Sequence, residues 1–128
     1  MGNTNRQQRG QQAETVALTY LQQQGLRLIT RNYRCRRGEI DLIMQHHDSI
    51  VFIEVRYRRN RDFGGADSSV DRRKQDKLIM SALHYLQRDR QAAKRPARFD
   101  VIAIHADRDA ATQADNIQWI QNAFQAQY

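Results

Sequence analysis

The chain has 128 residues, a length that suits one domain able to bury a core. It has one cysteine, Cys35, which excludes an internal disulfide and a multi-cysteine zinc site. No apolar run approaches the ~20 residues of a membrane helix, and the polar start does not have the form of a secretory signal. Lys and Arg number 21 against 14 Asp and Glu, a formal net charge of +7, so we expect a cytoplasmic protein that binds nucleic acid and not membranes.

The start of the chain predicts an arm, a helix and a strand. Residues 1–9 are polar, which indicates a flexible arm, and residues 10–128 are expected to form the single domain. Apolar side chains recur at helical spacing over residues 11–24, and Gly25 is a typical helix stop. Residues 26–33 then have the pattern of a first strand.

The rest of the chain predicts further strands around a second helix. Strand-like segments lie at 39–45, 50–57, 99–105 and 117–120. A polar turn joins the first two of these into a hairpin. The helix starts near Ser68 and Asp71, which have capping-box spacing, and ends near Arg88. The order α-β-β-β-α-β(-β) predicts an α/β fold with a mixed central sheet flanked by helices.

Carboxylates interrupt two of the predicted strands. The segments are Gly38-Glu39-Ile40-Asp41-Leu42-Ile43 and Val51-Phe52-Ile53-Glu54-Val55-Arg56. Side chains alternate along a strand, so Asp41 is expected on the face opposite Ile40 and Leu42. Pairing through the hairpin turn then brings Asp41 toward Glu54.

Two carboxylates this close repel each other unless a cation lies between them. Hard ions such as Mg²⁺ take oxygen ligands, and such a site polarises a phosphodiester and activates water. Arg56 shares a strand face with Glu54 and would stabilise charge on a phosphate. An ion pair of Arg56 with Glu54 or Asp41 on a solvated sheet face explains the spacing equally well.

Two polar residues lie beside the apolar faces of the predicted helices. Glu14 adjoins the apolar stripe of the first helix and can reach the pocket as a third acid. A favourable charge near a helix N-terminus is the alternative. Gln75 precedes Leu78 and Ile79 by three and four residues, so it faces inward and can orient water or contact phosphate. The alternative is an ordinary polar helix residue.

Four segments carry a family resemblance that covers about residues 12–120. They are Gly38-Glu39-Ile40-Asp41-Leu42-Ile43, Val51-Phe52-Ile53-Glu54-Val55-Arg56-Tyr57-Arg58, Phe63-Gly64-Gly65 and Lys74-Gln75. Together they resemble the YraN family of uncharacterised bacterial proteins. That family is similar to the restriction-endonuclease-like PD-(D/E)xK superfamily and to archaeal Holliday junction resolvases within it. The resemblance implies a restriction-endonuclease-like core, Mg²⁺ or Mn²⁺ as cofactor, and a fold compatible with a homodimer.

The resemblance also implies roles for individual residues. Asp41 matches the metal-binding aspartate of the superfamily, and Glu54 matches the acid of the (D/E)xK element. Val55 would offer its carbonyl oxygen to the metal. Glu14 matches the acid on the first helix of resolvase-type members, and Gln75 resembles the polar residue on the following helix.

Arg56 departs from the superfamily, which prefers lysine at that position. Arginine is effectively always protonated and is a poor general base. It still stabilises a negatively charged phosphate electrostatically. The departure therefore bears on catalysis, whereas metal binding by Asp41 and Glu54 does not depend on it.

Basic residues surround the acidic segments in sequence. Those expected to contact nucleic acid are Arg34, Arg36, Arg37, Arg58, Arg59, Arg72, Arg73 and Lys74. Phosphate contacts of this kind give salt-sensitive affinity without base specificity. A solvated protein face is the alternative for any one of these groups.

Three functions are compatible with this sequence. The first is a metal-dependent endonuclease acting on structured or branched DNA, with catalysis by Glu14, Asp41, Glu54, Arg56 and Gln75. The second is a nucleic-acid-binding module with a degenerate, silent site. The third is a protein-interaction adaptor, since a fold does not by itself decide a function.

Overall fold

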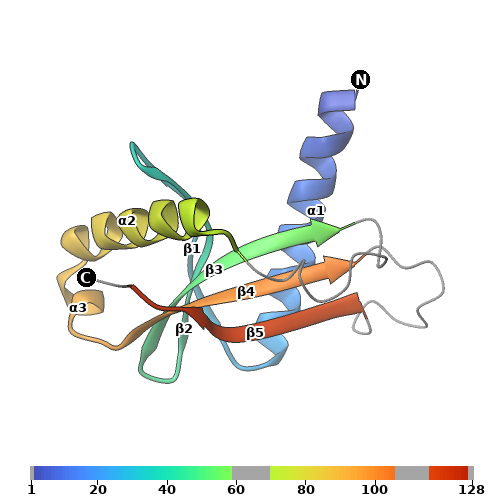
Figure 1. Cartoon of the computed structure of the whole chain (residues 1–128). Helices are drawn as coiled ribbons and strands as arrows, with labels where there is room; N and C mark the ends of the chain where they lie inside the picture. Colours follow the sequence, from blue (N-terminus) through green and yellow to red (C-terminus); the bar gives the residue numbers. More distant parts are fainter. Residues whose placement is uncertain (1, 59–69, 106–115, 127–128) are drawn as a thin grey trace.

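In the computed structural model, a five-stranded sheet has helices on both faces (Figure 1). The structure describes residues 2–58, 70–105 and 116–126. Its elements are α1 (Gly2–Gln23), β1 (Arg27–Cys35), β2 (Gly38–His46), β3 (Ser49–Arg58), α2 (Arg72–Arg88), α3 (Arg90–Ala93), β4 (Ala97–His105) and β5 (Ile117–Phe124). Within these ranges, no helix is long and apolar enough to cross a membrane.

The strands lie in the sheet in their order along the chain, from β1 to β5. β3 and β4 are parallel, whereas the other neighbouring pairs are antiparallel. A parallel pair needs a crossover connection, and α2 lies in that connection. The predicted mixed α/β fold, in the order α-β-β-β-α-β-β with helices beside the sheet, is therefore confirmed.

Helix α1 starts earlier than its apolar pattern predicts. It begins at Gly2, whereas the apolar spacing begins near residue 11. A helical backbone does not require apolar side chains at every turn, and the apolar pattern coincides with the α1 residues that are buried against the sheet, from Ala13 to Leu21. The flexibility of residues 1–9 stays a prediction.

Aspartate side chains cap the starts of the other two helices. Asp71 is the N-cap of α2, and its side chain accepts a hydrogen bond from the Lys74 N–H at 2.8 Å. Ser68, the other residue of the predicted capping box, lies outside the described residues. Asp89 caps the short helix α3 through the Ala92 N–H at 3.1 Å. No apolar pattern in the polar segment after α2 predicts α3.

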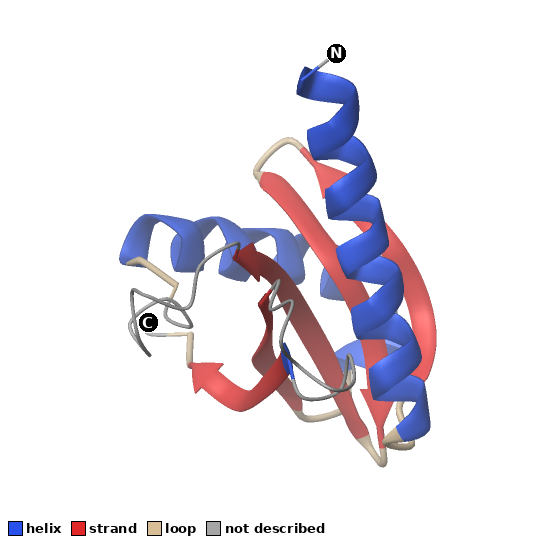
Figure 2. Ribbon diagram, turned by 90° about the vertical axis from the view of Figure 1, so that its right-hand side faces the viewer, coloured by secondary structure: helices blue, strands red, loops and turns tan. Residues whose placement is uncertain are grey.

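The two long helices pack on opposite faces of the sheet (Figure 2). Buried on the α1 side are Ala13, Ala17, Leu18, Leu21, Leu26, Leu42, Met44, Val51, Ile53, Ile102 and Ile104. Buried on the α2 side are Ile40, Ile43, Ile50, Phe52, Val70, Leu78, Ala82, Tyr85, Ala92, Phe99 and Val101. At about 25 cal/mol per Å² of buried apolar surface, these two layers provide the main stabilisation of the fold.

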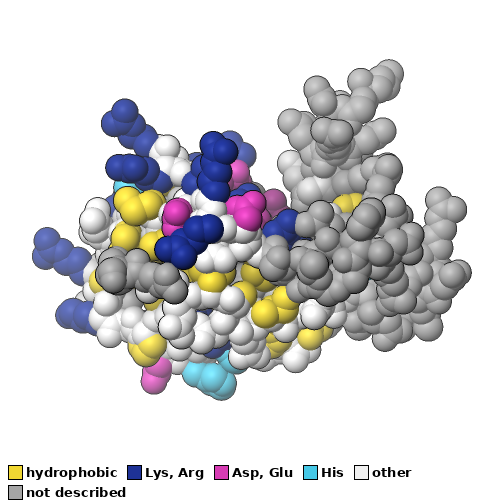
Figure 3. Space-filling model, in the orientation of Figure 1, with side chains coloured by type: hydrophobic (Ala, Val, Ile, Leu, Met, Phe, Trp, Pro, Cys, Tyr) yellow, Lys and Arg dark blue, Asp and Glu magenta, His cyan; other side chains and the backbone are white. Residues whose placement is uncertain are grey.

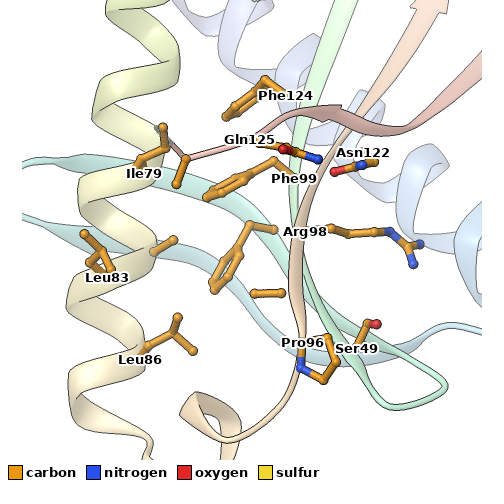
Figure 4. A pocket seen from close by; sticks show the side chains of 14 residues that line it. Ser49, Ile79, Leu83, Leu86, Pro96, Arg98, Phe99, Asn122, Phe124 and Gln125 are labelled. Atoms are coloured by element: carbon orange, nitrogen blue, oxygen red, sulfur yellow. The ribbon is translucent and has the colours of Figure 1, made fainter. Parts of the chain in front are cut away.

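An apolar cavity of about 510 Å³ lies where α2 meets β4 and β5 (Figure 4). Phe99 stacks between Phe52 and Phe124 there, with ring centroids 5.5 and 4.8 Å apart. Ile79, Leu83 and Leu86 of α2 form the opposite wall. No acidic side chain lines this cavity, so it is not the site that the strand carboxylates predict.

On the N-terminal side of Leu42, strand β2 turns away from β3. Leu42 pairs with Ile53 of β3, and the β2 residues before it continue to pair with β1. Ile40 packs on the α2 side but Leu42 packs on the α1 side, so the predicted strict alternation around Asp41 is wrong. In β1, opposite Asp41, the backbone of Asn32 is left-handed with a φ of 53°. This turn reorients the hairpin, whose teal tip projects beyond α2 in Figure 1.

Candidate active site

The divergence of β2 from β3 opens a fork in the sheet, and the strand carboxylates lie at this fork. Past the last β2–β3 pair, the Val55 N–H of β3 donates to Asp41 Oδ2 at 2.8 Å instead of to a β2 carbonyl. The side chain of Asp41 therefore replaces the missing backbone partner. This bond holds the Asp41 carboxylate against β3, next to Glu54.

Asp41 and Glu54 form a carboxyl pair in which Glu54 is buried and Asp41 is partly buried. Only 8% of Glu54 is exposed, and its carboxyl group is hydrogen-bonded to that of Asp41. Burial, and next the negative charge of Asp41, raise the pKa of Glu54 to about 8. Burial also raises the pKa of Asp41, against the opposing effect of the Val55 N–H bond. Both pKa values are raised, so the pair favours sharing a proton over carrying two negative charges.

Lys74 of α2 lies against this pair. Its Nζ is 3.6 Å from Glu54 Oε2. The two side chains border a cavity of about 260 Å³ lined by Glu54, Val55, Arg56, Tyr57, Asp71 and Lys74. Sequence spacing predicts Lys74 only as a contact for nucleic acid. The structure instead brings it to a carboxylate, because the N-terminal turn of α2 faces the end of β3.

Glu14 reaches the same region from α1, on the other side of the sheet. Burial, and next the negative charge of Asp41, raise the pKa of Glu14. Arg31 Nη2 lies 4.0 Å from Glu14 Oε1. With its amide oriented to donate, Asn32 Nδ2 lies 2.9 Å from Glu14 Oε1 and 3.1 Å from Glu39 Oε1. Asp41 is thus close enough to raise the pKa of Glu14, and Asn32 bridges Glu14 and Glu39.

Asn32 is a site residue that the sequence analysis missed. Asparagine tolerates the left-handed backbone conformation of Asn32 better than most other non-glycine residues. Its side-chain amide supplies the donor that bridges the two glutamates. An asparagine inside a predicted strand is a weak signal of such a turn. Its carboxylate partners come from different elements, so spacing along the chain does not predict them.

Arg56 and Gln75 differ in their relation to the cavity. Arg56 lines it, and its charge contributes to lowering the pKa of Glu54, although less than that of Lys74. Gln75 Nε2 donates to the Val70 carbonyl at 2.6 Å, just before α2, and Gln75 is not among the cavity-lining residues. In this structure Gln75 therefore stabilises the start of α2 through this hydrogen bond. Its contact with water or phosphate stays a prediction.

Lysine and arginine side chains gather over α2 and around the acidic side chains beside it (Figure 3). Arg36 and Arg37, at the tip of the β1–β2 hairpin, are exposed, as is Arg73 on α2. Arg34 pairs with Glu39 at 3.5 Å, and Arg72 pairs with Asp76 at 3.4 Å. The side chain of Arg58 and the whole of Arg59 lie outside the described residues.

The described residues contain no group of three or more His, Cys, Asp or Glu side chains arranged to hold a metal ion. The donors at the fork are the two carboxyl groups of Asp41 and Glu54. Oxygen donors of this kind suit Mg²⁺ or Mn²⁺, and two carboxylates with further ligands from water or substrate are a common way to hold such ions. The donor set therefore fits a divalent cation. A small mixed α/β protein with a buried carboxyl pair at a fork of its sheet is the class that fold and site define.

The comparisons with known proteins identify the family. The model of UPF0102, an uncharacterised protein family, matches residues 13–104. A UPF0102 protein of Nitrosococcus oceani is 52% identical over 93% of both chains. One of Stutzerimonas stutzeri is 51% identical over 94% of this chain and 97% of its own. The chain belongs to the UPF0102 family, which is the YraN family, and the names of these relatives state no activity.

Proposed function

We propose that this protein is a metal-dependent endonuclease that hydrolyses phosphodiester bonds in structured or branched DNA, on a restriction-endonuclease-like core. The observation that carries the proposal is the pair of Asp41 and Glu54, whose buried Glu54 lines a cavity together with Arg56 and Lys74. Carboxylate oxygens suit a divalent cation, and the neighbouring cations suit a phosphate. One small cavity therefore offers groups for both, with Mg²⁺ or Mn²⁺ as cofactor.

The state of the carboxyl pair supports metal binding. Glu54 is buried beside the partly buried Asp41, and the two carboxyl groups lie close enough to repel each other when both are ionised. A divalent cation in place of a shared proton would neutralise both groups. Asp41, oriented by the Val55 N–H, and Glu54 would hold the ion, and the Val55 carbonyl is the further ligand that the family resemblance implies.

The proposed hydrolysis forms one bond to phosphorus, breaks another and exchanges protons with solvent. A water oxygen forms a bond to phosphorus, and the bond from phosphorus to a sugar oxygen breaks. The water loses a proton to solvent, and the leaving oxygen takes one from solvent. A bound Mg²⁺ or Mn²⁺ supplies polarisation of the phosphate and a lower pKa of the water. Arg56 stays protonated, so its role is to stabilise the charge of the phosphate.

The test is a cleavage assay on labelled four-way-junction, flap, single-stranded and linear DNA, with a matched RNA. Mg²⁺ and Mn²⁺ are tried separately with the wild type, Asp41→Ala, Arg56→Lys and the control Asp76→Asn. Asp76 is an exposed acid of α2 that pairs with Arg72, so its loss leaves the carboxyl pair intact. We expect cleavage to be lost in Asp41→Ala and retained in Asp76→Asn.

Two results would contradict the proposal. One is cleavage by Asp41→Ala at the wild-type rate, which would indicate a contaminating nuclease. The other is absence of cleavage by the wild type in either metal. Faster cleavage by Arg56→Lys would show that Arg56 limits the chemistry.

A silent nucleic-acid-binding module is the second candidate function. The observation that favours it is the pairing of Glu54 with Lys74, which gives the buried carboxyl pair a cation without any metal. It predicts salt-sensitive DNA binding that persists in Asp41→Ala, with no cleavage by any variant. Absence of DNA binding as well would leave the protein-interaction adaptor.

A further inference from the structure

Lys74 has a half-exposed side chain on a backbone that is held by the helix cap. Its N–H donates to the Asp71 side chain at 2.8 Å, which holds the start of α2 beside the cavity. Its own side chain is 52% exposed, whereas that of its partner Glu54 is 10% exposed. The ammonium group is therefore attached to a rigid point but remains free to move on its flexible stem.

The contact between Lys74 and Glu54 is weak enough to exchange. At 3.6 Å, Nζ and Oε2 are farther apart than in a hydrogen bond, so Lys74 is attracted coulombically by the negative charge that the carboxyl pair retains. A divalent cation carries twice the charge of the ammonium group and would compete for the same carboxylate oxygens. The ammonium group, repelled by that ion, would then move within the cavity that it already lines.

Lys74 and Arg56 offer different cations to this cavity. Arg56 is half-buried on β3 and carries a planar guanidinium that stays charged. Lys74 is a compact point charge that can follow a phosphate. Of the two, Lys74 has the larger effect in lowering the pKa of Glu54, which supports its closer approach.

We infer that Lys74 is a catalytic residue of this site: its ammonium group leaves Glu54 when the carboxyl pair takes a divalent cation, and it then contacts the scissile phosphate. The inference rests on the proposed function. Lys74 would stabilise the negative charge that develops on a non-bridging phosphate oxygen as the water attacks.

The test compares Lys74→Met with Lys77→Met. Lys77 lies one turn along α2, is exposed and does not line the cavity, so it serves as a control for loss of one cation. Binding of a labelled four-way junction is measured by anisotropy over a range of salt, once in EDTA and once in Ca²⁺, with intact DNA verified on a gel. Single-turnover cleavage is measured in Mg²⁺ with saturating protein.

We expect the two variants to respond differently to the metal. In EDTA, where Glu54 holds Lys74, the DNA affinity of Lys74→Met should depend on salt as the wild-type affinity does. In Ca²⁺, its salt dependence should fall by about one phosphate contact. Any contact of Lys77 should be lost equally in both conditions. Cleavage should fall about 10²- to 10³-fold in Lys74→Met and change little in Lys77→Met. Lys74→Arg, which keeps the charge, should restore the binding in Ca²⁺.

The outcomes separate this inference from the endonuclease proposal. Equal loss of DNA contact by Lys74→Met in EDTA and Ca²⁺, or cleavage at the wild-type rate, would overturn the role of Lys74 alone. A third result is a wild type that cuts no DNA and still makes a Ca²⁺-dependent contact that Lys74→Met loses. That result would overturn the endonuclease proposal and support the contact of Lys74 with phosphate. No binding of DNA by the wild type would overturn both.

Discussion

The Glu54 carboxyl group links the chemistry of the site to the stability of the protein. Its ordinary pKa of 4.5 rises to about 8, first because of burial and then because of the charge of Asp41. Between these two values the unfolded chain releases a proton that the folded protein retains. The contribution of Glu54 to stability is therefore full below pH 4.5 and is lost as the pH rises toward 8.

Glu54→Gln should remove this pH dependence, because glutamine resembles the protonated side chain and can still donate to Asp41. We expect the variant to unfold with a free energy about 1–3 kcal/mol above that of the wild type at pH 8.5, and with the same free energy near pH 4.5. Urea denaturation at both pH values measures the difference. Asp76→Asn, which alters an exposed acid, should show no such change. A wild type at least as stable as Glu54→Gln at pH 8.5 would refute the explanation.

At the scale of elements, Asn32 connects α1, β1 and β2. Its left-handed backbone turns the hairpin at the fork, and its amide lies between Glu14 and Glu39. The bond from Asn32 lowers the pKa of Glu14 against the burial that raises it. One residue therefore shapes the backbone of the fork and reduces the repulsion between its outer acids.

Replacement of Asn32 by glycine or alanine should separate these two roles. Asn32→Ala loses the amide and also strains the left-handed backbone, whereas Asn32→Gly loses only the amide, so we expect the alanine variant to be less stable by about 1–2 kcal/mol. In both variants the pKa of Glu14 should rise, as followed by NMR titration. Asn122, with a φ of 52° in β5, is the control. Its alanine variant should show the backbone cost without a change at Glu14.

At the scale of the whole molecule, positive charge lies around a small acidic centre. The net charge of +7 and the exposed cations of the hairpin tip and α2 attract polyanions, while the carboxyl pair is buried beneath them. Lysine and arginine at this surface would hold phosphates on both sides of the fork. Under the proposed function, the exposed cations of the hairpin tip would contribute to binding and not to the chemical step.

The double variant Arg36→Ala/Arg37→Ala should weaken DNA binding without changing sequence preference. The loss of two phosphate contacts should reduce the slope of log affinity against log salt concentration by about two. Arg27→Ala/Arg95→Ala is the control, because it removes the same charge from exposed residues near the other end of the sheet. Equal losses in both double variants would indicate attraction by net charge alone, and anisotropy titrations at several salt concentrations distinguish these results.

The sequence by itself determined the order of elements and the approach of Asp41 to Glu54. Helical and strand periodicities are local, and a short turn between β2 and β3 leaves little freedom in their pairing. Predictions from local sequence patterns were wrong or missing where the backbone departs from regular geometry, and where a segment has no apolar periodicity. The left-handed turn at Asn32 broke the expected alternation around Asp41, and the polar helix α3 gave no pattern to detect.

The tertiary structure decided which groups surround the carboxyl pair. Lys74 reaches Glu54 across 20 positions of the chain, and Asn32 joins Glu14 of α1 to Glu39 of β2. These contacts depend on how helices pack on the two sheet faces and on the fork between β2 and β3. Spacing along a chain reports neighbours on one element, whereas the charge state of a buried carboxyl pair depends on every element that packs against it.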